Sequence, residues 1–415
     1  MDQIQRQLLL CLRAFRLGED AAETTESFSP EDWRRLYSLA AAHKISPVVY
    51  ETLWSVPGFC GGDPALAAAW KRDAITQAAG QTARTQKLLE LTGALDAAGV
   101  RYAVLKGAVC RQLYRKPDLR PSGDEDIFVP LEERSRCGEI FTHCGLAASA
   151  PDEEDCVDHW QDPCTGLHIE LHTKLFSSGW PAETVLNPYF SEQLLHSAPT
   201  AVEENMVLTL KPTAHFLFLV SHAMKHFIMG GFGVRTLSDI LSFAERYQES
   251  IDRNAVWGLL EQIHGTVFFE HLLSIGQAWL AFDPSPWGRL LPDPSDSDEL
   301  LNDMLDAGIY GQTSMDRKHS AALALRAVRT GQTETSLRAA LFPPASQLKG
   351  RYPILRRAPA LLPAVWLHRM GCYGLEVLRS RGKGNSPRET VSLGTKRTEM
   401  MVRYGILPQA QTEDR

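Results

Sequence analysis

The chain lacks the features that would direct it to a membrane or to an oxidising compartment. No uninterrupted apolar run is long enough to span a bilayer. The first residues include Asp2 and have no basic leader or cleavage signature, so we interpret them as an amphipathic helix. Eight cysteines in 415 residues include no CxxC pair and are too few for a disulfide scaffold. We therefore expect reduced, mostly buried cysteines in a cytoplasmic protein without a transmembrane segment.

An excess of positive charge is also missing. The net charge is −7, which argues against general nucleic-acid binding. The stretch 349–388 nevertheless contains nine Lys or Arg residues and one acidic residue. It is either a solvated helical face or a surface that attracts a polyanion, a nucleotide or an acidic membrane. For residues 359–381 we favour core packing over membrane-surface contact, because Pro363, Gly371 and Gly374 weaken a long continuous helix.

Hydrophobic periodicity divides the chain into successive regions. Residues 1–98 have helical spacing, with Ser29 before Pro30 as a helix start and Gly99 as a helix end. Apolar runs typical of strands lie at 100–105, 127–129 and 167–172, with a helix expected at 131–144. We predict an α+β protein: a helical region 1–98, a small mixed-sheet core 99–205, a helical region 206–283 that packs on it, a helical and basic region 299–382, and a polar tail 383–415.

Two aspartates, Asp124 and Asp126, stand one residue apart at the start of the second expected strand. Side chains alternate along a strand, so both carboxylates project from the same face. Their mutual repulsion is relieved by a cation between them, and Mg²⁺ commonly binds one or two carboxylates together with substrate phosphates. Gly123 leaves the backbone free to turn before the pair. The alternative is a solvated acidic turn.

Three segments together resemble a known group of enzymes. They are Leu105-Lys106-Gly107, the run RPSGDEDIFV from Arg120 to Val129, and Glu170-Leu171-His172. This constellation resembles the nucleotidyltransferase superfamily of the DNA polymerase β type, and more closely a family of uncharacterised bacterial nucleotidyltransferases. The resemblance extends over roughly residues 30–245. The sequence departs from the superfamily where Lys106-Gly107 replaces the usual Gly-Ser, which leaves the mode of phosphate binding open.

The resemblance implies a nucleotidyltransferase-type core that moves a nucleoside monophosphate from an NTP to a hydroxyl-bearing acceptor, either a small molecule or a protein. The implied catalytic and metal-binding residues for Mg²⁺ or Mn²⁺ are Asp124, Asp126 and Glu170. The implied nucleotide-binding residues are Lys106, Gly107, Arg120 and Gly123. Lys106 and Arg120 could instead form structural salt bridges, and Glu170 could be an exposed polar residue on an alternating strand. Gly107 would let the backbone N–H groups after it approach a phosphate.

Histidines supply further candidates. His222 and His226 are four residues apart on one helix face, where they could contact substrate or phosphate, bind Zn²⁺ or pack in the core. His172 shares a strand face with Glu170 and is a possible substrate contact. The alternative function is a catalytically weak nucleotide- or ligand-binding protein on the same fold. Clustering of the three carboxylates would favour the enzyme, and wide separation would favour the binding protein.

Overall fold

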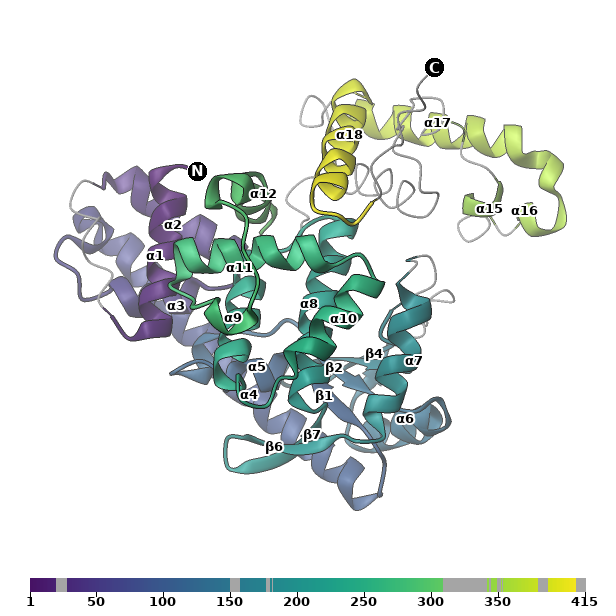
Figure 1. The fold of residues 1–415 in the computed structure, drawn as a ribbon, viewed down its shortest axis with the longest axis horizontal. Coiled ribbons are helices and arrows are strands. Elements are labelled where there is room, and N and C mark those ends of the chain that lie inside the picture. The colour runs from purple at the N-terminus through teal and green to yellow at the C-terminus, as the bar shows by residue number, and fades with distance from the viewer. Residues whose placement is uncertain are drawn as a thin grey trace.

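The computed structural model describes residues 1–19, 28–149, 157–176, 180, 182–308, 342, 345–348, 352, 354–379 and 387–407. Within these residues it is a mixed α+β protein in which a small sheet is flanked by helices before and after it (Figure 1). This arrangement confirms the predicted fold class. The described thiols are free, at Cys11, Cys60, Cys110, Cys137, Cys144 and Cys164. None of the described helices is long and apolar enough to cross a bilayer.

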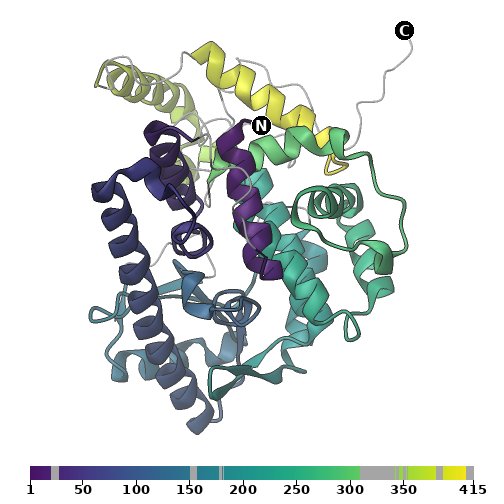
Figure 2. The ribbon, with the colours of Figure 1, turned by 90° about the vertical axis from the view of Figure 1, so that its left-hand side faces the viewer.

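The N-terminal region is helical, as predicted. Its helices are α1 (Gln3–Leu17), α2 (Pro30–Ala42), α3 (Ser46–Leu53) and α4 (Pro64–Ala97). The side chain of Ser29 accepts the backbone N–H of Asp32, and the side chain of Asp32 accepts the backbone N–H of Ser29, so a capping box starts α2. Gly99 adopts a left-handed φ of +68° just after α4, which a glycine tolerates without strain. Figure 2 shows α4 running along one side of the molecule down to the sheet.

The central sheet has five strands in the order β1-β2-β5-β4-β3. The strands are β1 (Ala103–Leu105), β2 (Glu125–Phe128), β3 (Ala147–Ala148), β4 (Val157–Gln161) and β5 (His168–His172). Only β2 and β5 pair in parallel, and the other neighbours are antiparallel. The chain between β2 and β5 contains α6 (Arg134–His143). A short helix, α5 (Gly107–Arg111), follows β1 after a turn of one residue.

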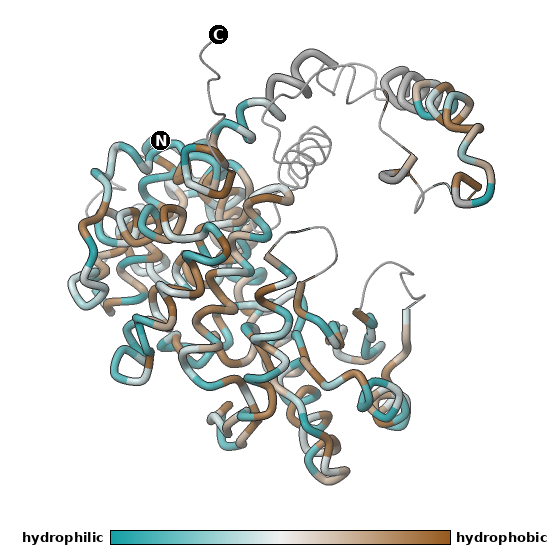
Figure 3. Tube along the Cα trace, turned by 45° about the vertical axis from the view of Figure 1, so that its right-hand side comes forward, coloured by the Kyte–Doolittle hydropathy of each residue, from teal (hydrophilic) through white to brown (hydrophobic). Residues whose placement is uncertain are grey.

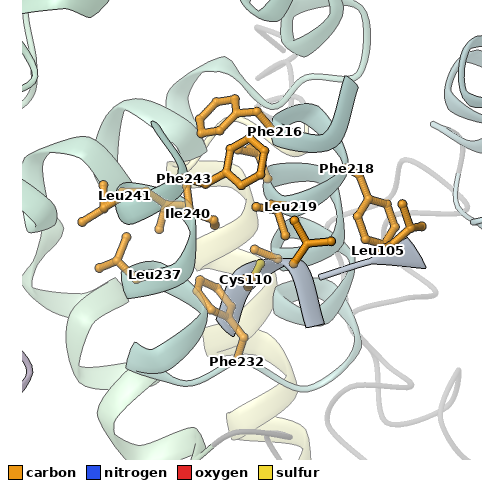
Figure 4. Packing of buried hydrophobic residues seen from close by; sticks show 14 of the residues in the cluster. Leu105, Cys110, Phe216, Phe218, Leu219, Phe232, Leu237, Ile240, Leu241 and Phe243 are labelled. Carbon is orange, nitrogen blue, oxygen red and sulfur yellow. The ribbon is translucent and has the colours of Figure 1, made fainter. Parts of the chain in front are cut away.

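Two of the helices after the sheet pack against β1 and α5. This part begins with α7 (Glu183–Leu194) and the hairpin β6 (Ala198–Val202) and β7 (Asn205–Thr209), followed by α8 (Pro212–Met229), α9 (Val234–Arg246), α10 (Arg253–Gln262), α11 (Thr266–Leu280) and α12 (Asp298–Ala307). Figure 4 shows Phe216 and Leu219 of α8, Phe243 of α9, and Leu105 and Cys110 in one buried cluster. This packing fixes α8 beside the turn that joins β1 to α5.

The C-terminal part differs from expectation in two places. Residues 383–415 were expected to form a polar tail, but α18 (Pro387–Arg403) is helical, and Met401 and Tyr404 near its end are fully buried. Arg397 of α18 donates to the carbonyl of Phe227 at the end of α8 and pairs with Asp303 of α12 at 3.1 Å. Met400, Met401 and Tyr404 of this segment therefore pack in the core of the body. Residues 408–415 lie outside the described part.

The second difference concerns the interrupted helix expected at 359–381. The structure has one helix, α17 (Leu362–Arg379), because Pro363 lies in its first turn, where a proline costs no hydrogen bond. With α15 (Ala345–Leu348) and α16 (Ile354–Arg357) it stands apart from the main body (Figures 1 and 3). Within the described residues this part has a small apolar cluster of its own. Much of the expected basic region, including 309–341, lies outside the described residues.

Candidate active site

The parallel pairing of β2 and β5 brings two predicted carboxylates together. Asp126 of β2 lies directly opposite Glu170 of β5 in the register. Parallel neighbours in register present their side chains on the same face of the sheet, so the two carboxylates share one surface. Asp124 precedes β2 and is partly exposed, whereas Asp126 is almost fully buried. The three carboxylates therefore gather at the edge of one sheet face.

Lys106 lies between the two aspartates. Its Nζ is 2.9 Å from Asp126 Oδ2 and 3.3 Å from Asp124 Oδ2. Lys106 forms the turn between β1 and α5, and β1 pairs with β2 so that Leu105 lies opposite Asp126. The lysine is therefore brought to the aspartates by the sheet itself. The salt bridge to the aspartate pair, one of its two alternatives, is present.

His172 completes a possible metal cluster. Its Nε2 is 3.0 Å from Asp126 Oδ1 and 3.4 Å from Glu170 Oε2. One ligand atom from each of Asp126, Glu170 and His172 can be chosen such that all three lie within 4.8 Å of one another. Two carboxylates and an imidazole within this distance have the chemistry and spacing to hold a divalent ion. The residues thus fit such an ion, and the Lys106 ammonium already provides positive charge at the same carboxylates.

The histidines of α8 approach from the side of Lys106. Its Nζ is 3.3 Å from His222 Nε2, which is also 3.2 Å from His226 Nε2. A lysine ammonium only donates, so His222 Nε2 is an acceptor and its proton is on Nδ1. His226 then donates from Nε2. Both predicted substrate-contact histidines therefore adjoin the carboxylate cluster, and neither is an isolated core residue.

Electrostatic coupling sets the protonation of these groups. The nearby Lys106 ammonium lowers the pKa of Asp124 to about 2, against the opposing effect of burial. Burial alone would lower the pKa of Lys106, but the three carboxylates raise it well above its ordinary value. Burial and the Lys106 charge lower the pKa of His226 to about 3. At neutral pH the site thus combines ionised carboxylates, a charged lysine and a neutral imidazole on α8.

Gly107 packs directly against a buried carboxylate. A Cβ at Gly107 would lie 2.0 Å from Glu125 Oε2. That carboxylate accepts the backbone N–H of Ala108 at 2.7 Å and pairs with buried Arg111 at 2.5 Å. The N–H that was expected to approach a phosphate therefore binds Glu125. This glutamate, on the opposite face of β2 from Asp126, ties the turn after β1 to the strand that carries the aspartates.

Arg120 is also placed away from the carboxylate cluster. Its guanidinium is buried and forms a two-armed ion pair with Asp239 of α9, at 2.5 Å and 3.1 Å. A third bond reaches Ser122 at 2.8 Å. Of its two alternatives, the structure has the structural salt bridge, which attaches the loop before β2 to α9. Gly123 lies exposed at the bend that follows this loop.

Comparison with known proteins identifies the family. A family model described as an uncharacterised nucleotidyltransferase matches residues 29–281. The chain belongs to this family. It is also similar to an antigenic nucleotidyltransferase-like protein from Paracoccidioides brasiliensis of known crystal structure, with 13% sequence identity and a TM-score of 0.32 over 50% of this chain and 97% of that one. No curated protein matches the chain.

Several residues that shape the site in this family member were not identified from the sequence. Glu125 and Arg111 form a buried pair beneath the aspartates, and Asp239 binds Arg120 from another helix. His215 of α8 accepts the backbone N–H of Lys106 at 3.1 Å. The role of Glu125 could have been predicted from the sequence. It lies between two aspartates whose side chains share one face of the strand, so its own side chain must point to the other face. That face is buried, and a carboxylate there needs a partner of opposite charge.

Proposed function

We propose that the protein transfers a nucleoside monophosphate from an NTP to a hydroxyl group on an acceptor, in a reaction that requires Mg²⁺ or Mn²⁺. The observation that carries the proposal is the convergence of Asp124, Asp126 and Glu170 around one half-buried lysine. Three carboxylates at one sheet edge are costly to keep ionised without a cation. A polyphosphate with a bound divalent ion supplies both the cation and new anionic partners for the lysine.

In this proposal Asp126, with Asp124 beside it, would hold the metal ion. Mg²⁺ suits such a site, because it binds through few carboxylates and keeps positions for water and phosphate oxygens, and Mn²⁺ accepts the same oxygen-rich donors. The bound ion supplies positive charge at the phosphates and thereby stabilises the charge that develops during transfer. In the metal-free protein His172 donates from Nε2 to Asp126 Oδ1 and orients that carboxylate. To serve as the third ligand, the same nitrogen would give up this proton when the ion binds.

The remaining residues act on the nucleotide and the acceptor. Lys106 turns from the carboxylates to the phosphate oxygens, which bind an ammonium equally well. The acceptor oxygen forms a bond to the α-phosphorus, the bond from that phosphorus to the pyrophosphate oxygen breaks, and the acceptor proton passes to Glu170. The pKa of Glu170 stays below its ordinary value because the hydrogen bond from His172 and the Lys106 charge outweigh burial, so the carboxylate is ionised and able to take a proton. Neutral His222 and His226 lie beside Lys106 and are the proposed contacts for the substrate.

The test is incubation of the full chain with each of the four α-labelled NTPs and MgCl₂, or MnCl₂, together with candidate acceptors or a small-molecule extract. We expect release of pyrophosphate and transfer of label to a small molecule or to protein. Asp126→Asn is the matched control, because it removes one charge with almost no change of shape. NTP binding by calorimetry without any pyrophosphate release would instead support a ligand-binding protein and contradict the proposed transfer.

A further inference from the structure

Lys106 has a backbone conformation that a residue with a side chain rarely adopts. Its φ is 35° and its ψ is −107°, between the end of β1 and the first residue of α5. Such conformations persist where surrounding contacts enforce them, and they are common at functional sites. In this case the turn projects the lysine side chain toward the carboxylates, while Gly107 and α5 follow on the other side. The contacts that hold the turn therefore decide where the ammonium lies.

One of these contacts comes from a histidine outside the carboxylate cluster. His215 Nε2 lies 3.1 Å from the backbone nitrogen of Lys106, and His215 Nδ1 lies 2.9 Å from Thr209 Oγ1. The Thr209 hydroxyl donates its proton to the carbonyl of Val104 at 2.7 Å, so it must accept from His215 Nδ1–H. The imidazole is thereby fixed with its proton on Nδ1. The unprotonated Nε2 accepts the Lys106 N–H.

The surroundings of His215 keep this arrangement constant. Its side chain is fully buried, with its ring centroid 4.9 Å from that of Phe243. Burial lowers the pKa of His215 to about 3, so the ring is neutral at physiological pH. Thr209 ends β7, whereas Val104 belongs to β1. The chain of bonds thus anchors the strained turn to both the hairpin and α8.

We propose that His215 is a positioning residue that aims the Lys106 ammonium at Asp124 and Asp126 by holding the Lys106 backbone in its strained turn. The inference extends the proposed function, in which Lys106 serves the phosphates, but the geometry on which it rests is independent of any nucleotide. Without the Nε2 acceptor, the buried N–H of Lys106 has to find another partner. The turn then relaxes toward an ordinary backbone conformation, and the side chain is carried away from the two carboxylates.

Two substitutions of similar polarity separate this role from simple packing. In His215→Gln the amide oxygen reaches the place of Nε2 and can still accept the Lys106 N–H. In His215→Asn the shorter amide reaches only the place of Nδ1, so contact with Thr209 is kept and contact with Lys106 is lost. A merely structural histidine would be replaced equally well, or equally badly, by both. Circular dichroism and thermal unfolding establish that each variant is folded.

The readout is the rate at which Lys106 reacts with acetic anhydride in the nucleotide-free protein, measured by peptide mass spectrometry. Lys87, which pairs with Glu90 on α4, is the internal reference. An ammonium released from the two carboxylates is more exposed and loses its proton more readily, and only the uncharged amine reacts, so the rate rises. We expect His215→Asn to raise the Lys106 rate about tenfold or more relative to Lys87, and His215→Gln to keep the wild-type ratio.

A wild-type ratio in folded His215→Asn, or equal acceleration in both variants, overturns the proposal. If His215→Asn does not fold, Thr209→Val serves instead, because it removes the hydroxyl that fixes the tautomer and leaves the side-chain shape. Acceleration in Thr209→Val supports the proposal, and an unchanged ratio overturns it. The labelling uses no NTP, so its result holds whether or not transfer of a nucleotide is observed. Failure of the transfer assay alone contradicts the proposed function and leaves the role of His215 intact.

Discussion

Replacement of Lys106 by methionine should increase the affinity of the nucleotide-free protein for a divalent ion. The lysine ammonium contacts Asp126 Oδ2 at 2.9 Å and Asp124 Oδ2 at 3.3 Å. An ion that binds these carboxylates must first displace the ammonium from them. Methionine has nearly the same length and no charge, so Lys106→Met removes the competing cation with little loss of packing.

The size of the effect follows from these two contacts. A hydrogen bond to a charged group contributes about 1.5–3 kcal/mol, so two of them cost the incoming ion about 3–6 kcal/mol. The displaced ammonium regains part of this from water, which favours the lower end of the range. A difference of about 3 kcal/mol corresponds to roughly 100-fold tighter binding of the metal. The carboxylates of metal-free Lys106→Met repel one another without a counter-charge, so its melting temperature should fall and rise again when the metal is added.

The assay is titration of the metal alone into protein without nucleotide. Mn²⁺ is the probe, because its free concentration can be followed by electron paramagnetic resonance, and thermal unfolding is recorded with and without it. Lys87→Met is the matched control, since it removes a lysine that pairs with Glu90 on α4, away from the carboxylate cluster. Equal or weaker Mn²⁺ binding by Lys106→Met, with Lys87→Met unchanged, would refute the idea that the lysine competes with the ion.

Three further predictions concern the site and its support. Glu170→Gln should cut pyrophosphate release at every Mg²⁺ concentration; recovery at high Mg²⁺ would show a metal ligand and not a base. Gly107→Ala should lower the free energy of unfolding in urea by about 3 kcal/mol, because its Cβ meets the buried Glu125 carboxylate at 2.0 Å; a loss below about 0.5 kcal/mol would contradict this. Burial lowers the pKa of His43 to about 4, so its contribution to stability is complete above pH 6.5 and is lost as the pH falls toward 4. The loss of unfolding free energy amounts to about 3 kcal/mol at most. His43→Gln should flatten the dependence of the unfolding free energy on pH between about 4 and 6.5. An unchanged slope in this pH range would contradict the prediction.

The face that carries the carboxylates could be predicted because it depends on a local rule. Alternation along a strand places Asp124 and Asp126 together, and it places Glu170 and His172 together on a second strand. That these strands are neighbours was an assumption, which the parallel register of Asp126 with Glu170 meets. The regular elements were predictable for the same reason: the capping residue Ser29 and the helix-ending glycines act on their immediate neighbours.

Features that depend on distant partners could not be predicted in this way. The sequence left Arg120 free to bind phosphate or an acid, and the choice is made by Asp239, which lies 119 residues further along the chain. The role of Gly107 depends on Glu125, whose carboxylate reaches it only after β1 and β2 have paired. The helix α18 was missed because it has few apolar residues, and its importance comes from what it covers. The hairpin β6–β7 was missed although half of its residues are apolar.

The bond from Arg397 to the carbonyl of Phe227 also has a consequence for biosynthesis. Phe227 directly follows His226 near the end of α8, and the arginine that braces this end is synthesised 170 residues later. At about 5–20 residues per second, a ribosome needs roughly 10–30 s to cover that distance. During this time α8 carries the site histidines with its last turn unbraced. The end of α8 should therefore reach its final rigidity only after α18 has left the ribosome and docked on it.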